Sequence, residues 1–89
     1  MLCRIYDVPG GTLEQYEQVD ERLGSEKPEG VHVHIAGKTD AGFRVIEVWD
    51  SPEHIERFME QGLGEALQEA QIPEPTITEF EVHNLDWVG

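Results

Sequence analysis

The sequence predicts one α+β domain in which strands and helices follow the order β-α-β-β-α-β. Three observations predict it: two β-rich runs joined by a short glycine-flanked bend, two amphipathic stretches that each begin with a helix cap, and β-prone segments near both ends. A chain of 89 residues suits a single domain over residues 1–89. We therefore expect a ferredoxin-like fold, with an antiparallel four-stranded sheet and both helices on one face.

The first strand and the first helix are marked by their boundaries. Residues 1–8 (MLCRIYDV) are β-prone, and the Pro-Gly-Gly run at 9–11 ends them. Thr12 then begins a capping box, since Gln15 stands three residues later. Apolar residues recur at helical spacing from there until Gly24, which is typical of a helix end.

Residues 30–38 (GVHVHIAGK) and 42–50 (GFRVIEVWD) predict an antiparallel hairpin, because glycines flank the three residues between them. His32 and His34 lie in the first of these runs, and side chains two apart on a strand point the same way. We expect this strand to lie at the centre of the sheet, with both faces covered.

The second helix begins at Ser51, a favourable N-cap followed by Pro52 at the first helical position. Gly62 and Gly64 predict a bend in its middle. One face of this helix is apolar and comprises Ile55, Phe58, Met59, Leu63, Ala66, Leu67 and Ala70.

The strands of the hairpin carry large apolar side chains on both faces, although two helices can cover only one face. We therefore expect the second face to pack against another copy of the chain, as an isologous homodimer. The last strand is predicted at residues 76–85 and is followed by the tail 86–89. Trp87 in this tail either reaches the partner or belongs to a frayed end.

Composition limits the partners and the compartment. Nineteen acidic residues against six basic ones give a formal charge of -13, which disfavours nucleic acid and anionic membranes as partners. Cys3 is the only cysteine, so no disulfide forms within a chain, and we expect it to be a buried small hydrophobe. The absence of a signal-peptide pattern and of an apolar run of ~20 residues predicts a cytoplasmic protein.

The residue types in the hairpin suggest acid–base chemistry. An imidazole titrates near neutrality, so His34 can remove a substrate proton, and Glu47 on the neighbouring strand can orient it. Two alternatives remain open: a purely structural histidine, and a metal site made by His32, His34 and Glu47. The expected substrate-binding residues are Tyr6, His32, Arg44, Trp49 and Phe58.

Residues 47–63 (EVWDSPEHIERFMEQGL) resemble the dimeric α+β barrel superfamily, in particular its antibiotic-biosynthesis-monooxygenase-like branch. In that branch a strand ending in Glu-x-Trp runs into a Ser-capped helix, here Glu47, Trp49 and Ser51. His34 holds the histidine position of the Gly-x-x-x-His strand found in small bacterial members. Phe58 stands where several members carry a histidine.

The resemblance implies a homodimer in which two sheets face each other, each subunit having a pocket between its own sheet and helices. It implies a small cofactor-independent enzyme, monooxygenase-like or a cyclase or isomerase, that acts on an aromatic or polyketide-like metabolite. The alternatives are a non-catalytic ligand-binding or accessory dimer of the same fold and, less favoured, the metal-dependent site described above.

Overall fold

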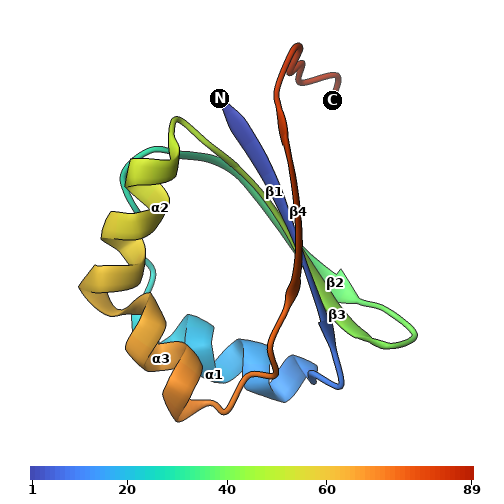
Figure 1. Ribbon diagram of the computed structural model, residues 1–89, viewed down its shortest axis with the longest axis vertical. Helices are drawn as coiled ribbons and strands as arrows, with labels where there is room; N and C mark the ends of the chain where they lie inside the picture. The colour runs from blue at the N-terminus through green and yellow to red at the C-terminus, as the bar shows by residue number, and fades with distance from the viewer.

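The computed structural model describes every residue from Met1 to Gly89. Four strands form one antiparallel sheet: β1 (Leu2–Pro9), β2 (Val31–Lys38), β3 (Gly42–Trp49) and β4 (Thr76–Glu81). The helical segments are α1 (Leu13–Leu23), α2 (Pro52–Phe58), the π-helix η1 (Met59–Leu63) and α3 (Gly64–Glu69). The expected element order is confirmed, with all helical segments on one side of the sheet (Figure 1).

The strand order is β2-β3-β1-β4, so β1 and β3 form the centre. The expectation that β2 lies at the centre is wrong, because β2 pairs with β3 alone and is an edge strand. The reason is topological: after the hairpin turn, β3 returns to pair with β1, and this pairing leaves β2 outside.

The helix boundaries have the chemistry that the sequence predicts. Thr12 caps α1 in a reciprocal capping box with Gln15, and Gly24 ends the helix with a positive φ of 80°. The expected bend in the second helix is a kink within η1, where Gly62 leaves helical geometry with a φ of 147°. This conformation suits glycine alone.

The core lies between the sheet and the helices. Val8, Phe43 and Val45 form a cluster on the sheet, while Val19, Ala66 and Ala70 form a second one between α1 and α3. Ile72 packs against both.

Pairing in the sheet also defines rows of side chains on the face away from the helices. One row crosses the sheet as Phe80, Cys3, Val48 and Val33, and the next as Thr78, Ile5, Ile46 and Ile35. Cys3 is buried, as expected. At the edge strands, however, Ile35 is 55% exposed and Phe80 is 53% exposed. The second apolar face predicted from the sequence is therefore present, and it is uncovered at its edges.

Candidate functional site

On the helix-facing side of the sheet, one row of four polar residues crosses all four strands. Glu79 on β4 lies opposite Arg4 on β1, Arg4 lies opposite Glu47 on β3, and Glu47 lies opposite His34 on β2. The neighbouring row is largely apolar and runs through Ile77, Tyr6, Val45 and Ala36. A polar row beneath helices is costly unless its members are paired, so each partner matters.

Glu47 is the most deeply placed member of this row, being only 9% exposed. The indole N–H of Trp49 donates to its Oε1 at 3.1 Å. The ring Nδ1–H of His34 donates to its other oxygen, Oε2, at 3.0 Å. Each carboxylate oxygen is thereby satisfied, which accounts for a carboxylate at a buried position.

Tyr16 on α1 completes the chain of hydrogen bonds. Its hydroxyl lies 2.7 Å from Nε2 of His34. Since Nδ1 must carry a proton to donate to Glu47, the neutral imidazole accepts the Tyr16 proton at Nε2. We call Tyr16, His34, Glu47 and Trp49 the Glu47 network.

Aromatic contacts hold this network in place. The Tyr16 ring stacks on the His34 ring, with 6.2 Å between centroids, and meets Phe43 edge-on at 5.8 Å. Trp49 is only 1% exposed, and its ring centroid lies 5.8 Å from that of Phe58. The His34 side chain remains 46% exposed, so the outer end of the network reaches solvent.

Electrostatics favours a proton on His34. The hydrogen bond to Glu47 raises the pKa of His34, burial opposes this, and the charges of Glu47 and Asp20 add to the increase. Burial raises the pKa of Tyr16, and the same two carboxylates increase it further. The arrangement therefore combines a strengthened base with a phenol that stays protonated.

The two residues expected to be catalytic, His34 and Glu47, lie in direct contact. Trp49 contacts Glu47, and Phe58 contacts Trp49. Tyr6 lies one row away on the same face, where burial raises its pKa and a hydrogen bond from Arg4 opposes the increase.

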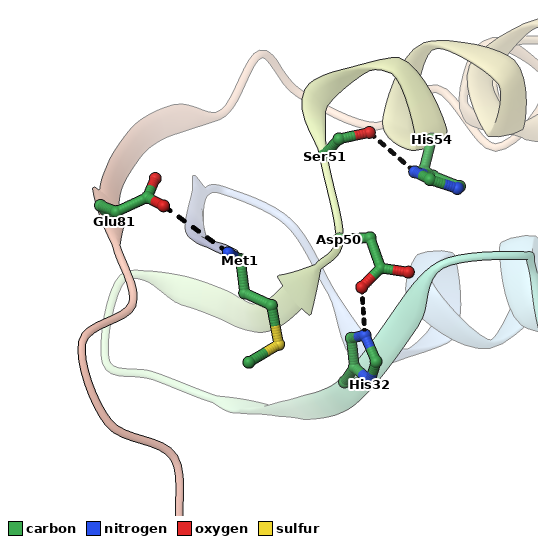
Figure 2. Close-up of polar contacts among 6 residues, drawn as sticks. All are labelled: Met1, His32, Asp50, Ser51, His54 and Glu81. Carbon is green, nitrogen blue, oxygen red and sulfur yellow. Dashed lines mark hydrogen bonds and ion pairs between the residues drawn. The ribbon is translucent and has the colours of Figure 1, made fainter.

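Two of the expected residues lie apart from the network. A bulge between Val31 and Val33 interrupts the regular alternation of β2, and His32 hydrogen-bonds to Asp50 at 2.6 Å (Figure 2). Arg44 pairs with Asp7 at 2.6 Å in the row that lies on the face away from the helices. Neither side chain joins the Glu47 network.

The three-ligand metal site is not assembled in this structure. No group of three or more His, Cys, Asp and Glu side chains is placed to hold a metal ion. His34 and His32 are each engaged with a different carboxylate. His54 is engaged as well, because its Nδ1 hydrogen-bonds to Ser51 Oγ at 2.7 Å (Figure 2).

Two members of the site, Tyr16 and Arg4, are not predicted from the sequence. Tyr16 stands at one of the apolar positions of the first helix, and this spacing does not indicate that its hydroxyl contacts His34. Arg4 donates to Glu79 at 2.9 Å, and only the strand register reveals that it lies in the polar row. Alternation along β1 does place Arg4 and Tyr6 on one face, so the sequence indicates that these two side chains point the same way.

Two surface hollows lie outside the Glu47 network. One is lined by Pro28, Glu29, His54, Arg57, Phe58 and Gln61, and the other by residues of α1 and α3. Phe58 is therefore shared between a hollow and the contact with Trp49.

Comparison with known proteins supports the fold. No protein family matches the sequence, and no curated protein matches it significantly. Among solved structures, a predicted antibiotic biosynthesis monooxygenase from Deinococcus radiodurans superposes with a TM-score of 0.64 at 13% identity, covering 100% of this chain and 99% of that one.

An arginine-to-serine variant of MhuD, solved with two manganese protoporphyrin IX molecules per active site, gives a TM-score of 0.60 at 21% identity over 100% of both chains. The chain thus has the antibiotic-biosynthesis-monooxygenase-like, ferredoxin-like fold that the resemblance predicted. At these identities the likeness concerns the fold alone. None of the helices is long and apolar enough to cross a membrane.

Proposed function

We propose that this protein is a small homodimeric enzyme, monooxygenase-like or a cyclase or isomerase, that acts without a cofactor on an aromatic or polyketide-like metabolite. The observation that carries the proposal is the hydrogen-bonded chain from Trp49 through Glu47 to His34. A carboxylate that fixes the tautomer of an imidazole and makes it more basic is a recurring arrangement in enzymes that move protons.

The chemistry follows from this base. Once an acidic phenol, enol or activated carbon has lost its proton, the resulting anion is electron-rich enough to react with oxygen or to cyclise. His34 supplies the base and Glu47 stabilises the imidazolium that forms. Phe58 is partly exposed and offers aromatic surface to a planar ligand, while Trp49, only 1% exposed, supports Phe58 and Glu47 from the core. We expect this chemistry to take place in the cytoplasm.

The homodimer is supported by the face of the sheet that the helices leave uncovered. Two apolar rows cross that face, and Ile35 and Phe80 are each more than half exposed. Contiguous apolar surface of this kind is typical of protein–protein contacts.

A non-catalytic ligand-binding or accessory dimer is the second candidate. It is favoured by one observation: the Tyr16 hydroxyl already occupies Nε2 of His34. In this case the Glu47 network would bind a ligand, or only stabilise the edge strand β2, without catalysing a reaction.

The test is oxygen consumption and product analysis with a hydroxylated anthrone, whose acidic carbon yields an oxygen-reactive anion. The wild type is compared with His34→Gln and with His83→Gln, a control at an exposed histidine beyond β4. We expect His34→Gln to lose about 100-fold in rate, the lower range for a general base, and His83→Gln to retain the wild-type rate. Equal rates in a folded His34→Gln variant would contradict the role of His34. Binding of the anthrone without turnover by the wild type would favour the second candidate.

A further inference from the structure

The base nitrogen of His34 is not open to a substrate. Nδ1 is engaged with Glu47, and Nε2 lies 2.7 Å from the Tyr16 hydroxyl. A substrate can therefore reach this imidazole in two ways: it displaces Tyr16, or it exchanges its proton through the Tyr16 oxygen.

The contacts of Tyr16 favour the second route. Its ring lies at 28° to the His34 ring and at 66° to the Phe43 ring, and it packs against the buried cluster that contains Phe43. Displacement would break these contacts together with the hydrogen bond, whereas transfer through the hydroxyl keeps all of them. The Tyr16 side chain is only partly buried, and its hydrogen bond to His34 lies at an exposed position.

We propose that Tyr16 is the residue that exchanges the proton with the substrate, and that His34, backed by Glu47, is the base behind it. This inference rests on the proposed function. In the step, the acidic O–H or C–H bond of the substrate breaks and its proton bonds to the Tyr16 oxygen. At the same time the Tyr16 O–H bond breaks and its proton bonds to Nε2 of His34. The bonding electron pair stays on the substrate, Tyr16 remains neutral, and the imidazolium faces Glu47.

The relay has a consequence for the product of the step. Protonated His34 now donates from Nε2 to the Tyr16 oxygen, so the Tyr16 proton points away from the imidazole and toward the substrate anion. One hydroxyl thus passes the proton and afterwards stabilises the negative charge. A phenol placed to donate in this way must not ionise, and burial together with Asp20 and Glu47 keeps the pKa of Tyr16 raised.

The experiment uses 4-nitrophenol as the probe, because its phenolate is yellow and reports loss of its proton directly. The probe is added to the wild type, Tyr16→Phe, His34→Gln and the control His83→Gln at a pH at which NMR shows His34 of the free wild type to be unprotonated, and its absorbance is compared with that of the free probe at the same pH. Tyr16→Phe keeps the ring contacts and removes only the hydroxyl. Circular dichroism confirms that each variant is folded.

We expect the wild type and His83→Gln to increase the phenolate absorbance of the bound probe. In Tyr16→Phe the bound phenolate fraction should fall about tenfold, the equivalent of one pKa unit, and in His34→Gln the increase should vanish. Nitrogen NMR of wild-type His34 should show Nε2 becoming protonated as the probe is added.

The outcomes separate the two proposals. If folded Tyr16→Phe produces as much phenolate as the wild type, His34 takes the proton directly. This result would contradict the proton relay through Tyr16 and leave the role of His34 as the base intact. If the wild type itself produces no phenolate, and Nε2 of His34 stays unprotonated on addition of the probe, the base role fails and the relay fails with it.

Discussion

His34 shows how one side chain depends on residues that are remote in sequence. Its two nitrogens lie against a carboxylate from β3 and a phenol from α1, and these partners stand 13 and 18 residues away along the chain. Because the imidazole is 46% exposed, water screens its pairing with Glu47, so the pair contributes at most about 1 kcal/mol to stability.

This pairing predicts a pH dependence of stability. The pKa of His34 is raised in the folded state above its ordinary value of 6.5. The folded state therefore holds this proton more tightly than the unfolded state does. The resulting stabilisation is fully present below pH 6.5 and is lost as the pH rises through the folded-state pKa.

The prediction is tested with His34→Gln, which removes the titrating group. We expect the difference in free energy of unfolding between wild type and variant to be larger near about pH 6 than near about pH 9, as measured by urea denaturation. A difference that grows from pH 6 to pH 9 would contradict the direction of the pKa shift.

At the scale of single residues, the sequence predicts the pair of His34 and Glu47 but not the residues that contact it. Glu47 and His34 were predicted from their chemistry and from their positions on neighbouring strands. The contact of Tyr16 with His34 was not predicted, because a helical tyrosine at an apolar position is usually a core residue. Only the packing of α1 over β2 brings its hydroxyl to His34. His32 was expected to point with His34, but the bulge at Val31–Val33 disturbs the alternation on which that expectation depended.

Among the elements, the helical region from α2 to α3 shows most clearly why one backbone position requires glycine. Gly62 allows the chain to turn between α2 and α3 at a φ of 147°. A Cβ added there would meet only Leu23, at 4.0 Å, so space is not the obstacle to a side chain. The cost of a substitution comes from the backbone conformation itself.

We therefore expect Gly62→Ala to lower the free energy of unfolding by about 1–3 kcal/mol. Gly37→Ala is the matched control, since Gly37 has no positive φ and a Cβ there meets nothing within 4 Å. The control should stay within about 0.5 kcal/mol of the wild type. If thermal or urea unfolding gives equal effects for the two variants, conformational strain at Gly62 is not what limits substitution.

The elements themselves were largely predictable, because their signals are local. The capping box of Thr12 and Gln15, the hairpin and the bend at Gly62 each depend on residues within a few positions. The place of β2 in the sheet was not predictable in this way. It depends on β3 pairing with β1 across the intervening helix, which no pattern within β2 encodes.

The molecule as a whole is a sheet with helices on one side (Figure 1). On the other side, apolar side chains of the edge strands are exposed. If two copies cover these faces mutually, the mass in solution is twice that of the 10.1 kDa chain. A charge introduced into the uncovered face would then be buried at the interface, where it is costly. The net charge of -13 repels the partner, so we expect tighter association at higher salt.

The dimer is tested with Phe80→Glu, whose site is 53% exposed in the single chain. Light scattering after gel filtration should give a dimer for the wild type and a monomer for the variant. Leu13→Glu adds the same charge at an exposed position of α1, in the helical part of the chain, and should remain dimeric. A wild type that elutes as a 10.1 kDa monomer at all concentrations and salt levels would contradict the proposed assembly.

The hydrogen bond to Glu47 makes His34 a stronger base, and an NMR titration of the His34 ring measures this effect. We expect a pKa above the ordinary value of 6.5 in the wild type and a lower pKa in Glu47→Gln, because the neutral amide cannot stabilise the imidazolium as a carboxylate does. A His34 pKa that is the same in the two folded proteins would contradict this effect of Glu47.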